Sequence, residues 1–217
     1  MTSQTQEQVD ARNEWFNSLA RWSGMPPRTG ATHVLMTFLP SSGTKKAYQA
    51  AIDYLTAKRE HHFITFVGEP GRGKTHLAIG IGWQWLSQNL GTMKYWQVSE
   101  LLDAMRREYD GPPKDRYGVL LKSIFDMCKD ADLLILDDLG VQKTTEWVAD
   151  KLDTLINHRW LEEKPTIFTT NLAPNQLQPR IRSRLREGVV VTLEGPDYRE
   201  IKAKRRKEYA ENSTAIA

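Results

Sequence analysis

The stretch from residue 63 to residue 88 restricts the fold of this chain more than any other part of the sequence. An apolar run, FITFV (63–67), leads into the turn GEPGRGK and then into THLAIGIGWQWLSQ (75–88), which has the composition of a helix. The turn matches the spacing G-x-x-x-x-G-K-T, in which glycines let the backbone curl so that its N–H groups point inward. A buried strand, a glycine turn and a helix in this order predict an α/β domain with a phosphate-binding loop.

Each residue type in the turn suits a nucleotide phosphate. Backbone N–H groups and the positive end of the following helix would attract the phosphate oxygens. Lys74 would contact the β- and γ-phosphates, and the hydroxyl of Thr75 would hold Mg²⁺. The residues expected to contact the nucleotide from this turn are Gly68, Glu69, Pro70, Gly71, Arg72, Gly73, Lys74, Thr75 and His76. The alternative is a plain turn with a surface lysine.

A second apolar strand, LLILDDLG (133–140), carries two carboxylates after its four leading apolar residues. Its carboxyl end is where open α/β sheets bind ligands. Asp137 would hold Mg²⁺ through water, and Asp138 would orient or deprotonate the attacking water. The alternative for Asp138 is that it caps the following turn. Since aspartate is one methylene shorter than the glutamate common at this position, we expect slow hydrolysis.

The strand order separates this chain from simple nucleotide kinases. MKYWQV (93–98) predicts an additional strand between Thr75 and Asp137. This favours the P-loop class in which another strand lies between the lysine strand and the aspartate strand, and TIFTTN (166–171) is the candidate for that place. The Asn171 amide at its tip would hold the attacking water against the γ-phosphate. Alternatively, Asn171 is a turn residue at a strand end.

Strands alternate with helices along most of the chain, which predicts a parallel sheet covered by helices on both faces. The further helices are expected at residues 45–55, 99–109, 144–160, 175–185 and 198–211, and a last strand at 189–193. Ser99 is the expected cap of the second of these helices. We expect a short amphipathic helix and a proline-containing linker over residues 1–30, as a candidate partner-binding segment, and the ATPase domain over residues 31–217.

Composition excludes several classes of protein. A net charge of +3 is small, so any affinity for nucleic acid must come from local clusters of basic residues. Cys128 is the only cysteine, which excludes an internal disulfide and a cysteine-based zinc site. No run approaches the ~18 apolar residues of a membrane span, and the N-terminal stretch lacks the apolar core of a signal peptide. We therefore expect a cytoplasmic protein without a membrane partner.

Taken together, the motifs resemble the AAA+ ATPases of the DnaC/IstB type, which are bacterial and phage helicase loaders and their transposon relatives. The motifs that carry this resemblance are, in chain order, SGMPPR, GEPGRGKTHLA, YWQVSELLDAMR, LLILDDLG, TTN, RIRSRL and GPDYRE. The resemblance implies the AAA+ (ASCE) P-loop fold, ATP with Mg²⁺ as cofactors, and assembly into a ring or spiral. It also implies single-stranded DNA and a replicative helicase as partners.

Further residue roles are implied by this resemblance alone. Arg184 in RIRSRL matches the arginine finger that reaches a neighbour's γ-phosphate, with three nearby arginines as competitors and a solvated basic face as the alternative. Arg199 in GPDYRE matches the second sensor, which contacts the γ-phosphate of its own subunit. VLMTF (34–38) falls where the family contacts the base, although Leu35 and Phe38 also suit a core.

The segment from residue 99 to residue 118 falls where this group inserts helices that line the central pore and hold single-stranded DNA. Tyr109 or Tyr117 would be available for stacking on bases. The candidates for contacting the phosphate backbone are Arg106, Arg107, Lys114 and Arg116. A solvated helix face is the alternative explanation of these charges, as it is for the basic run from Arg199 to Lys207.

The N-terminal segment departs from the family, because loaders usually carry a larger helicase-binding region there. Its aromatic and apolar side chains would form a small anchor for a partner or pack on the chain's own domain. These side chains are Trp15, Phe16, Leu19 and Trp22. The leading hypothesis remains a helicase loader acting in DNA replication. The alternatives are an IstB-type transposition helper on duplex DNA and an ATP-dependent scaffold with incidental turnover.

Overall fold

A five-stranded parallel sheet forms the centre of the computed structural model, which describes residues 6–26, 34–56, 61–108, 111, 113–140 and 145–200. The strands are β1 (Phe63–Val67), β2 (Met93–Gln97), β3 (Leu133–Asp137), β4 (Thr166–Thr170) and β5 (Val189–Thr192). Their order is β2-β3-β4-β1-β5, and every neighbouring pair is parallel. The prediction that TIFTTN separates the lysine strand from the aspartate strand is confirmed.

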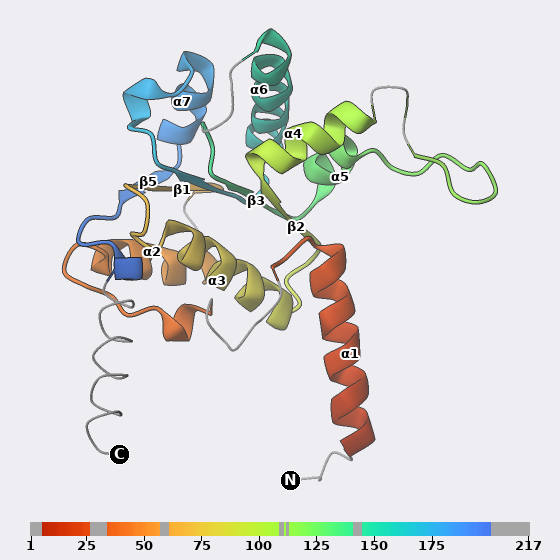
Figure 1. Ribbon diagram of the computed structural model, residues 1–217, viewed down its shortest axis with the longest axis horizontal. Coiled ribbons are helices and arrows are strands. Elements are labelled where there is room, and N and C mark those ends of the chain that lie inside the picture. Colours follow the sequence, from red (N-terminus) through yellow and green to blue (C-terminus); the bar gives the residue numbers. More distant parts are fainter. Residues whose placement is uncertain are drawn as a thin grey trace, which may run out of the picture.

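Helices cover both faces of this sheet (Figure 1). One side carries α1 (Gln6–Trp22), α2 (Lys45–Leu55), α3 (Lys74–Ser87) and the short 3-10 turn η2 (Leu35–Thr37). The other side carries α4 (Val98–Arg107), α5 (Ile124–Asp130), α6 (Glu146–Leu161), η3 (Pro174–Gln176) and α7 (Pro179–Arg186). The predicted alternation of strands and helices is therefore confirmed, whereas α5 was not predicted.

Two apolar cores lie on opposite faces of the sheet. Ile64 and Phe66 of β1 belong to the core under α2 and α3, whereas Phe63 packs against Phe168 of β4 in the core under α4 to α7, with ring centroids 5.2 Å apart. All five residues of β1, β3 and β4 are buried. Strands covered on both faces are expected to be continuous apolar runs, which is why these strands were recognisable in the sequence.

The start of α4 differs from the prediction. The helix begins at Val98, its N-cap is Gln97, and no side chain caps it, so the expected role of Ser99 is wrong. The chain passes from β2 into α4 without an intervening loop, and Ser99 is already inside the first turn.

The part of the predicted linker that the structure describes packs on the domain. Ser23 and Met25 are buried, and the Ser23 carbonyl accepts a hydrogen bond of 2.8 Å from the backbone N–H of Tyr95 in β2. This segment therefore covers the edge of β2. Residues 27–30 of the expected linker and residues 201–211 of the expected C-terminal helix lie outside the described residues. Within the described part, no helix combines the length and the apolar character required to span a bilayer.

Candidate nucleotide site

The glycine-rich turn connects β1 to α3 and is held in shape by close approaches that exclude a side chain. Gly73, the N-cap of α3, has a φ of 93°, and a Cβ there would lie 2.7 Å from the Phe38 ring. Gly71 has a φ of 75°, and a Cβ there would overlap the carboxylate of Asp197. Both positions require glycine because L side chains rarely adopt this backbone region. The loop therefore presents its backbone, as phosphate binding requires.

Lys74 lies in the mouth of this loop, where it is buried. Its ammonium donates a hydrogen bond of 2.8 Å to the Glu69 carbonyl. Burial lowers the pKa of Lys74, and the negative charges of Asp138 and Asp137 offset part of that effect. Arg72 pairs with the Glu69 carboxylate at 2.6 Å but keeps a buried Nη1 without a hydrogen-bond partner. The loop thus contains buried donors that an anion would satisfy.

Asp137 receives hydrogen bonds from three side-chain hydroxyl groups. Thr75 donates to its two oxygens at 2.9 and 3.2 Å, Thr169 of β4 donates at 2.6 Å, and Tyr95 of β2 donates at 2.9 Å. The carboxylate is 1% exposed. The structure therefore brings together the two residues expected to hold Mg²⁺, Thr75 and Asp137. Sequence reasoning missed Tyr95 and Thr169, because nothing in their local patterns indicates contact with a carboxylate on another strand.

Asp138 follows Asp137 in a left-handed backbone conformation, with a φ of 58°. Its backbone N–H is fixed by the Thr169 hydroxyl at 2.9 Å, while its carboxylate accepts no hydrogen bond from any described residue. Residues 141–144 of the following turn lie outside the described residues, so the alternative role of Asp138 as a cap stays a prediction. Burial and the neighbouring charge of Asp137 raise the pKa of Asp138, and the positive charges of Lys74 and Arg199 oppose that rise.

Two further candidates lie beside this group. Asn171 is exposed immediately after β4, at the carboxyl edge between β1 and β3. The charge of Arg199 acts on the pKa of both Lys74 and Asp138, which puts its guanidinium within electrostatic range of the loop. The segment that carries Arg199 rests on the loop, since the Tyr198 N–H donates to the Gly71 carbonyl at 3.1 Å.

Residues 34–38 also adjoin the loop. His76 Nε2 lies 3.1 Å from the Val34 carbonyl oxygen, and the Phe38 ring meets the His76 ring edge-on at 5.3 Å and stacks on Tyr48 at 5.6 Å. Leu35 and Phe38 are each 8% exposed. Both side chains belong to the apolar core under α2 and α3, and contact of this segment with a nucleotide base stays a prediction.

Arg184 is bound within its own chain and away from this loop. It donates to Asn157 Oδ1 at 3.2 and 3.0 Å and to Glu187 at 3.1 Å, and its guanidinium lies 3.8 Å from the Trp160 ring centroid. All these contacts are on α6 and α7. Arg180, one turn earlier, has a side chain that is 84% exposed. Arg180 is also paired, with Asp153 at 3.2 Å, but Arg184 has more contacts and is less exposed.

The DNA-binding candidates are divided between α4 and an extended hairpin. On α4, Arg106 and Arg107 are both exposed, and Arg106 pairs with Asp103 at 2.8 Å and lies 5.1 Å from the Trp147 ring centroid. The expected insertion of helices is therefore wrong beyond α4. Residues 113–121 instead fold back on themselves in a hairpin.

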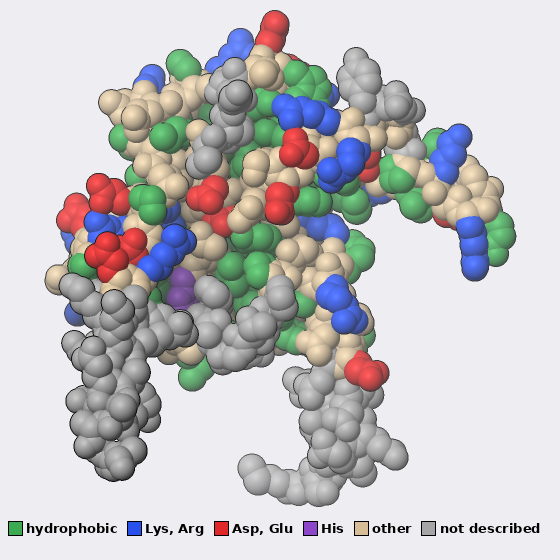
Figure 2. Space-filling view, in the orientation of Figure 1, with side chains coloured by type: hydrophobic (Ala, Val, Ile, Leu, Met, Phe, Trp, Pro, Cys, Tyr) green, Lys and Arg blue, Asp and Glu red, His purple; other side chains and the backbone are tan. Residues whose placement is uncertain are grey.

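This hairpin, residues 113–121, projects from the domain between α4 and α5 (Figure 1). Lys114 and Leu120 pair in an antiparallel bridge. The Tyr117 side chain is 77% exposed, and the Arg116 guanidinium lies 5.0 Å from its ring centroid. Figure 2 shows Lys and Arg side chains at the far end of this arm. The hairpin thus combines an aromatic face with positive charge, which are the features of a single-strand binding surface.

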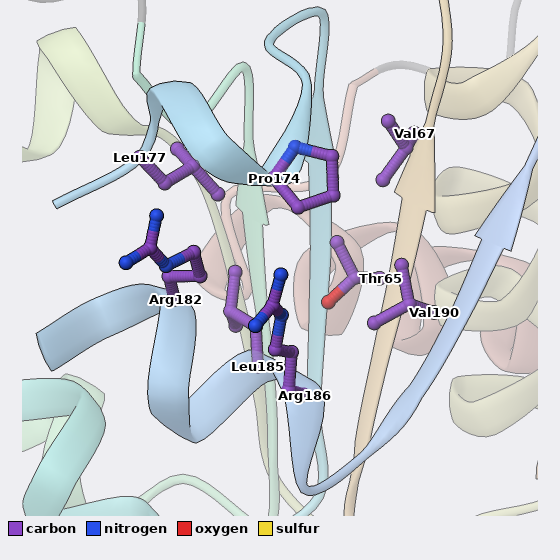
Figure 3. A pocket seen from close by; sticks show the side chains of 8 residues that line it. All are labelled: Thr65, Val67, Pro174, Leu177, Arg182, Leu185, Arg186 and Val190. Atoms are coloured by element: carbon purple, nitrogen blue, oxygen red, sulfur yellow. The ribbon is translucent and has the colours of Figure 1, made fainter. Parts of the chain in front are cut away.

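A small pocket lies on the other side of β1, away from the phosphate loop (Figure 3). It has a volume of about 10 Å³, which is room for roughly one water molecule. Thr65 is 1% exposed there, and its hydroxyl has no hydrogen-bond partner. The residues that line the pocket are Thr65, Val67, Pro174, Leu177, Arg182, Leu185, Arg186 and Val190. This pocket is too small for a nucleotide.

Comparison with known families gives one match that covers most of the chain. The model of the family described as IstB-like ATP binding protein matches residues 5–181. Among curated proteins, the replicative helicase loader DnaI of Bacillus subtilis is 29% identical over 112 residues, which are 51% of this chain and 33% of DnaI. The first curated relatives are matched over only 33–50% of their own length. The sequence prediction of a DnaC/IstB-type chain is confirmed.

Solved structures show the same fold. The crystal structure of DnaI has a TM-score of 0.61 and 25% identity, covering 79% of this chain and 93% of that chain. The replication initiator DnaA bound to AMPPCP and single-stranded DNA has a TM-score of 0.66 and 22% identity, covering 82% of this chain and 56% of that chain. The predicted AAA+ P-loop fold is therefore confirmed.

Proposed function

Because the chain belongs to the family of IstB-like ATP binding proteins, we propose that it is an ATP-dependent helicase loader. It binds ATP and Mg²⁺ at subunit interfaces, assembles on single-stranded DNA as a ring or spiral, and delivers a replicative helicase during the initiation of DNA replication in the cytoplasm. The observation that carries the ATP-binding part is the contact between Thr75 and Asp137 beside the buried Lys74. The helicase part is supported by the relationship to DnaI.

The residues of the site fit Mg²⁺ that arrives with a nucleotide. A hydroxyl and a carboxylate are hard oxygen ligands, and Mg²⁺ commonly takes one or two such groups together with substrate phosphates. Within the described ranges no three His, Cys, Asp or Glu side chains cluster in a way that would hold a metal alone. Thr75 and Asp137 would hold the ion, which would neutralise charge developing on the phosphates.

The reaction assigned to this site is ATP hydrolysis. Lys74 exchanges the Glu69 carbonyl for the β- and γ-phosphates, and the carboxylate of Asp138 accepts a hydrogen bond from the attacking water. Asn171, at the tip of the intervening strand, orients the same water, and Arg199 contacts the γ-phosphate of its own subunit. Hydrolysis is slow because Asp138 is shorter than glutamate, so turnover serves as a release switch.

A neighbouring subunit would complete the site with a cation that is accessible and held in position. Arg184 on α7 has a half-buried side chain that is 30% exposed and is held by several contacts. Its contacts to Asn157, Glu187 and Trp160 reduce the conformational freedom that a flexible arginine would lose on docking. Assembly would therefore place Arg184 at the γ-phosphate of the adjacent subunit.

Single-stranded DNA is favoured over duplex DNA by the hairpin. Tyr117 offers an open ring for a base, and Arg116 and Lys114 lie on the same hairpin near the phosphates that flank such a base. Arg106 and Arg107 continue the basic surface onto α4. For the helicase, α1 presents Trp15 and Trp22, which are 57% and 52% exposed, while Phe16 and Leu19 pack on the domain.

A second candidate function is a transposition helper that assembles on duplex DNA, because the matching family model is the IstB-like one. The test is to measure particle mass and ATP turnover with ATP, Mg²⁺ and either DNA form, for the wild type, Arg184→Ala and the control Arg180→Ala. Oligomers on single strands, with turnover lost only in Arg184→Ala, support the loader and its finger. Assembly on duplex DNA alone would favour the helper, and no ATP-dependent assembly would overturn both.

A scaffold with incidental turnover is tested by Asp137→Ala. In a loader, DNA raises the ATPase rate of the wild type, and the variant loses that rate together with its response to DNA. A scaffold would keep its protein contacts and DNA binding when turnover is abolished.

A further inference from the structure

The proposed metal ligand Asp137 and the N-terminal segment are joined by a single residue, Tyr95. Its phenol donates to Asp137 Oδ2 at 2.9 Å, and its backbone N–H donates to the Ser23 carbonyl at 2.8 Å. Tyr95 is 7% exposed and is paired with Ile135 in the parallel ladder between β2 and β3. Tyr95 thus connects the proposed nucleotide site, through its side chain, with the proposed partner-binding segment, through its backbone.

The three hydroxyl groups around Asp137 are not equivalent once a nucleotide is bound. The Thr75 hydroxyl is itself expected to bind the metal, so it would no longer orient the carboxylate. Thr169 donates to Oδ1 and at the same time accepts the Asp138 N–H. Tyr95 is then the hydroxyl that fixes Oδ2. A hydrogen bond to a carboxylate that holds a metal, directly or through a bound water, sets the orientation of that carboxylate and thereby the metal affinity.

The N-terminal segment sits tightly against the backbone of Tyr95. Gly24 has a φ of 74°, and a Cβ there would lie 2.7 Å from the Tyr95 carbonyl oxygen. The preceding residue of β2, Lys94, donates its ammonium hydrogen to the Trp22 carbonyl and lies over the Trp22 ring. Displacement of the end of α1 therefore acts directly on β2 at Lys94 and Tyr95.

We propose that Tyr95 is a positioning residue for Asp137, and that it makes metal binding at the nucleotide site depend on the seating of the N-terminal segment. The inference rests on the proposed function, because it requires Asp137 to bind Mg²⁺ with ATP. A partner that pulled on α1 would then change the metal affinity of the site without touching the nucleotide.

The first test is Tyr95→Phe in the full chain, which removes only the hydroxyl. Mn²⁺ replaces Mg²⁺ as the probe, and its binding is measured by electron paramagnetic resonance in the presence of ATP. We expect the Mn²⁺ dissociation constant to rise about tenfold, while the affinity for a fluorescent ATP analogue in EDTA is unchanged. The control is Tyr54→Phe, which removes another buried hydroxyl, one that donates to the His62 carbonyl at 2.6 Å.

The outcomes of this test are distinct. Equal Mn²⁺ affinities in Tyr95→Phe and the wild type would overturn the positioning role. The role would also be overturned if Tyr54→Phe lost as much Mn²⁺ affinity as Tyr95→Phe, because the loss would then reflect general destabilisation. A wild type that binds no Mn²⁺ with ATP would instead contradict the proposed function itself.

The second test addresses the link to the N-terminal segment. Gly24→Ala pushes the segment away from Tyr95, and we expect it to weaken Mn²⁺ binding about threefold or more in the wild-type background but little in the Tyr95→Phe background. Additive effects, or no effect of Gly24→Ala, would overturn the link. If Gly24→Ala does not fold, Lys94→Met releases the Trp22 carbonyl and is subject to the same comparison.

Discussion

Thr75 donates its hydroxyl hydrogen to both carboxylate oxygens of Asp137, at 2.9 and 3.2 Å, from a position 62 residues earlier in the chain. The contact joins the first turn of α3 to the end of β3, across the strand β4 that lies between β1 and β3. Both residues are hard oxygen ligands, so the same pair that binds together here would share a Mg²⁺ ion in the ATP complex.

Thr75→Ala should lower ATP turnover by about 100-fold or more, because it removes a proposed metal ligand at the developing phosphate charge. Thr75→Ser, which keeps the hydroxyl, should retain most of the rate. The measurement is steady-state phosphate release at saturating ATP over a range of Mg²⁺ concentrations. A Thr75→Ala rate equal to that of Thr75→Ser would contradict the assignment.

Asp138→Asn should lose turnover but gain stability at neutral pH. Burial raises the pKa of Asp138 above its ordinary value of 3.8. At a pH between 3.8 and the folded pKa, the Asp138 carboxyl therefore keeps its proton in the folded protein but loses it in the unfolded chain. Stability from this group therefore falls as pH rises from 3.8 through the folded pKa, and above that pKa the charge is a net cost. The partly exposed site limits the gain of the variant to about 0.5 kcal/mol.

Urea unfolding at several pH values checks this prediction. The variant should be more stable than the wild type at pH 7, and the difference should vanish as pH falls toward 3.8. A variant less stable at pH 7 would show that the Asp138 charge stabilises the folded state. Asp138→Glu serves as the functional control and should raise turnover, since it restores the longer base.

Site residues were predictable from the sequence where a contiguous stretch of the chain identifies them. The loop with Lys74 and Thr75 was predictable because strand, turn and helix are contiguous. Asp137 was predictable because it ends a continuous apolar run. Tyr95 and Thr169 were not, because their contact with Asp137 depends on the register of three strands, which no local pattern specifies.

The same distinction holds for the fold, in which elements with a clear local pattern were predicted and the others were missed. Buried parallel strands are apolar runs, so β1 and β4 were found within one residue of their ends. The strand expected at 133–140 begins as predicted but ends at Asp137. The seven-residue helix α5 is too short to show a helical period. The hairpin at residues 113–121 was missed because its signals, prolines and a glycine among charged residues, only indicate a loop. On α1 the period located one apolar stripe but could not tell that Phe16 packs inward and Trp15 faces outward.

Tyr117→Ala should weaken binding of single-stranded DNA by about 5- to 150-fold, because loss of a base-stacking ring costs roughly 1–3 kcal/mol. Trp15→Ala, which removes an exposed aromatic from α1, should leave DNA binding unchanged. Fluorescence anisotropy with a labelled oligonucleotide gives both affinities. Equal losses in the two variants would mean that the effect is not specific to the hairpin.

Lys114→Ala should weaken DNA binding uniformly across sequences and reduce its dependence on salt. Each phosphate contact contributes about 0.7 to the slope of log affinity against log salt for single strands. Titrations at several salt concentrations should therefore show a slope lower by roughly that amount. Lys46→Ala on α2 is an exposed-lysine control, and the prediction fails if it changes the slope equally.

Arg159→Met should be among the most destabilising single substitutions in the chain. Arg159 is 0% exposed and donates to the carbonyls of Cys128, Ala131 and Pro165 at 2.8, 2.8 and 2.6 Å and to the Thr166 hydroxyl at 2.8 Å. Methionine fills the space but leaves these acceptors buried without donors, which costs about 3–5 kcal/mol in the free energy of unfolding. Urea unfolding at pH 7 measures the loss, and Arg159→Lys should recover only part of it because one ammonium cannot reach acceptors on both sides of the guanidinium. A loss below about 1 kcal/mol in Arg159→Met would show that water replaces the missing donors at this position.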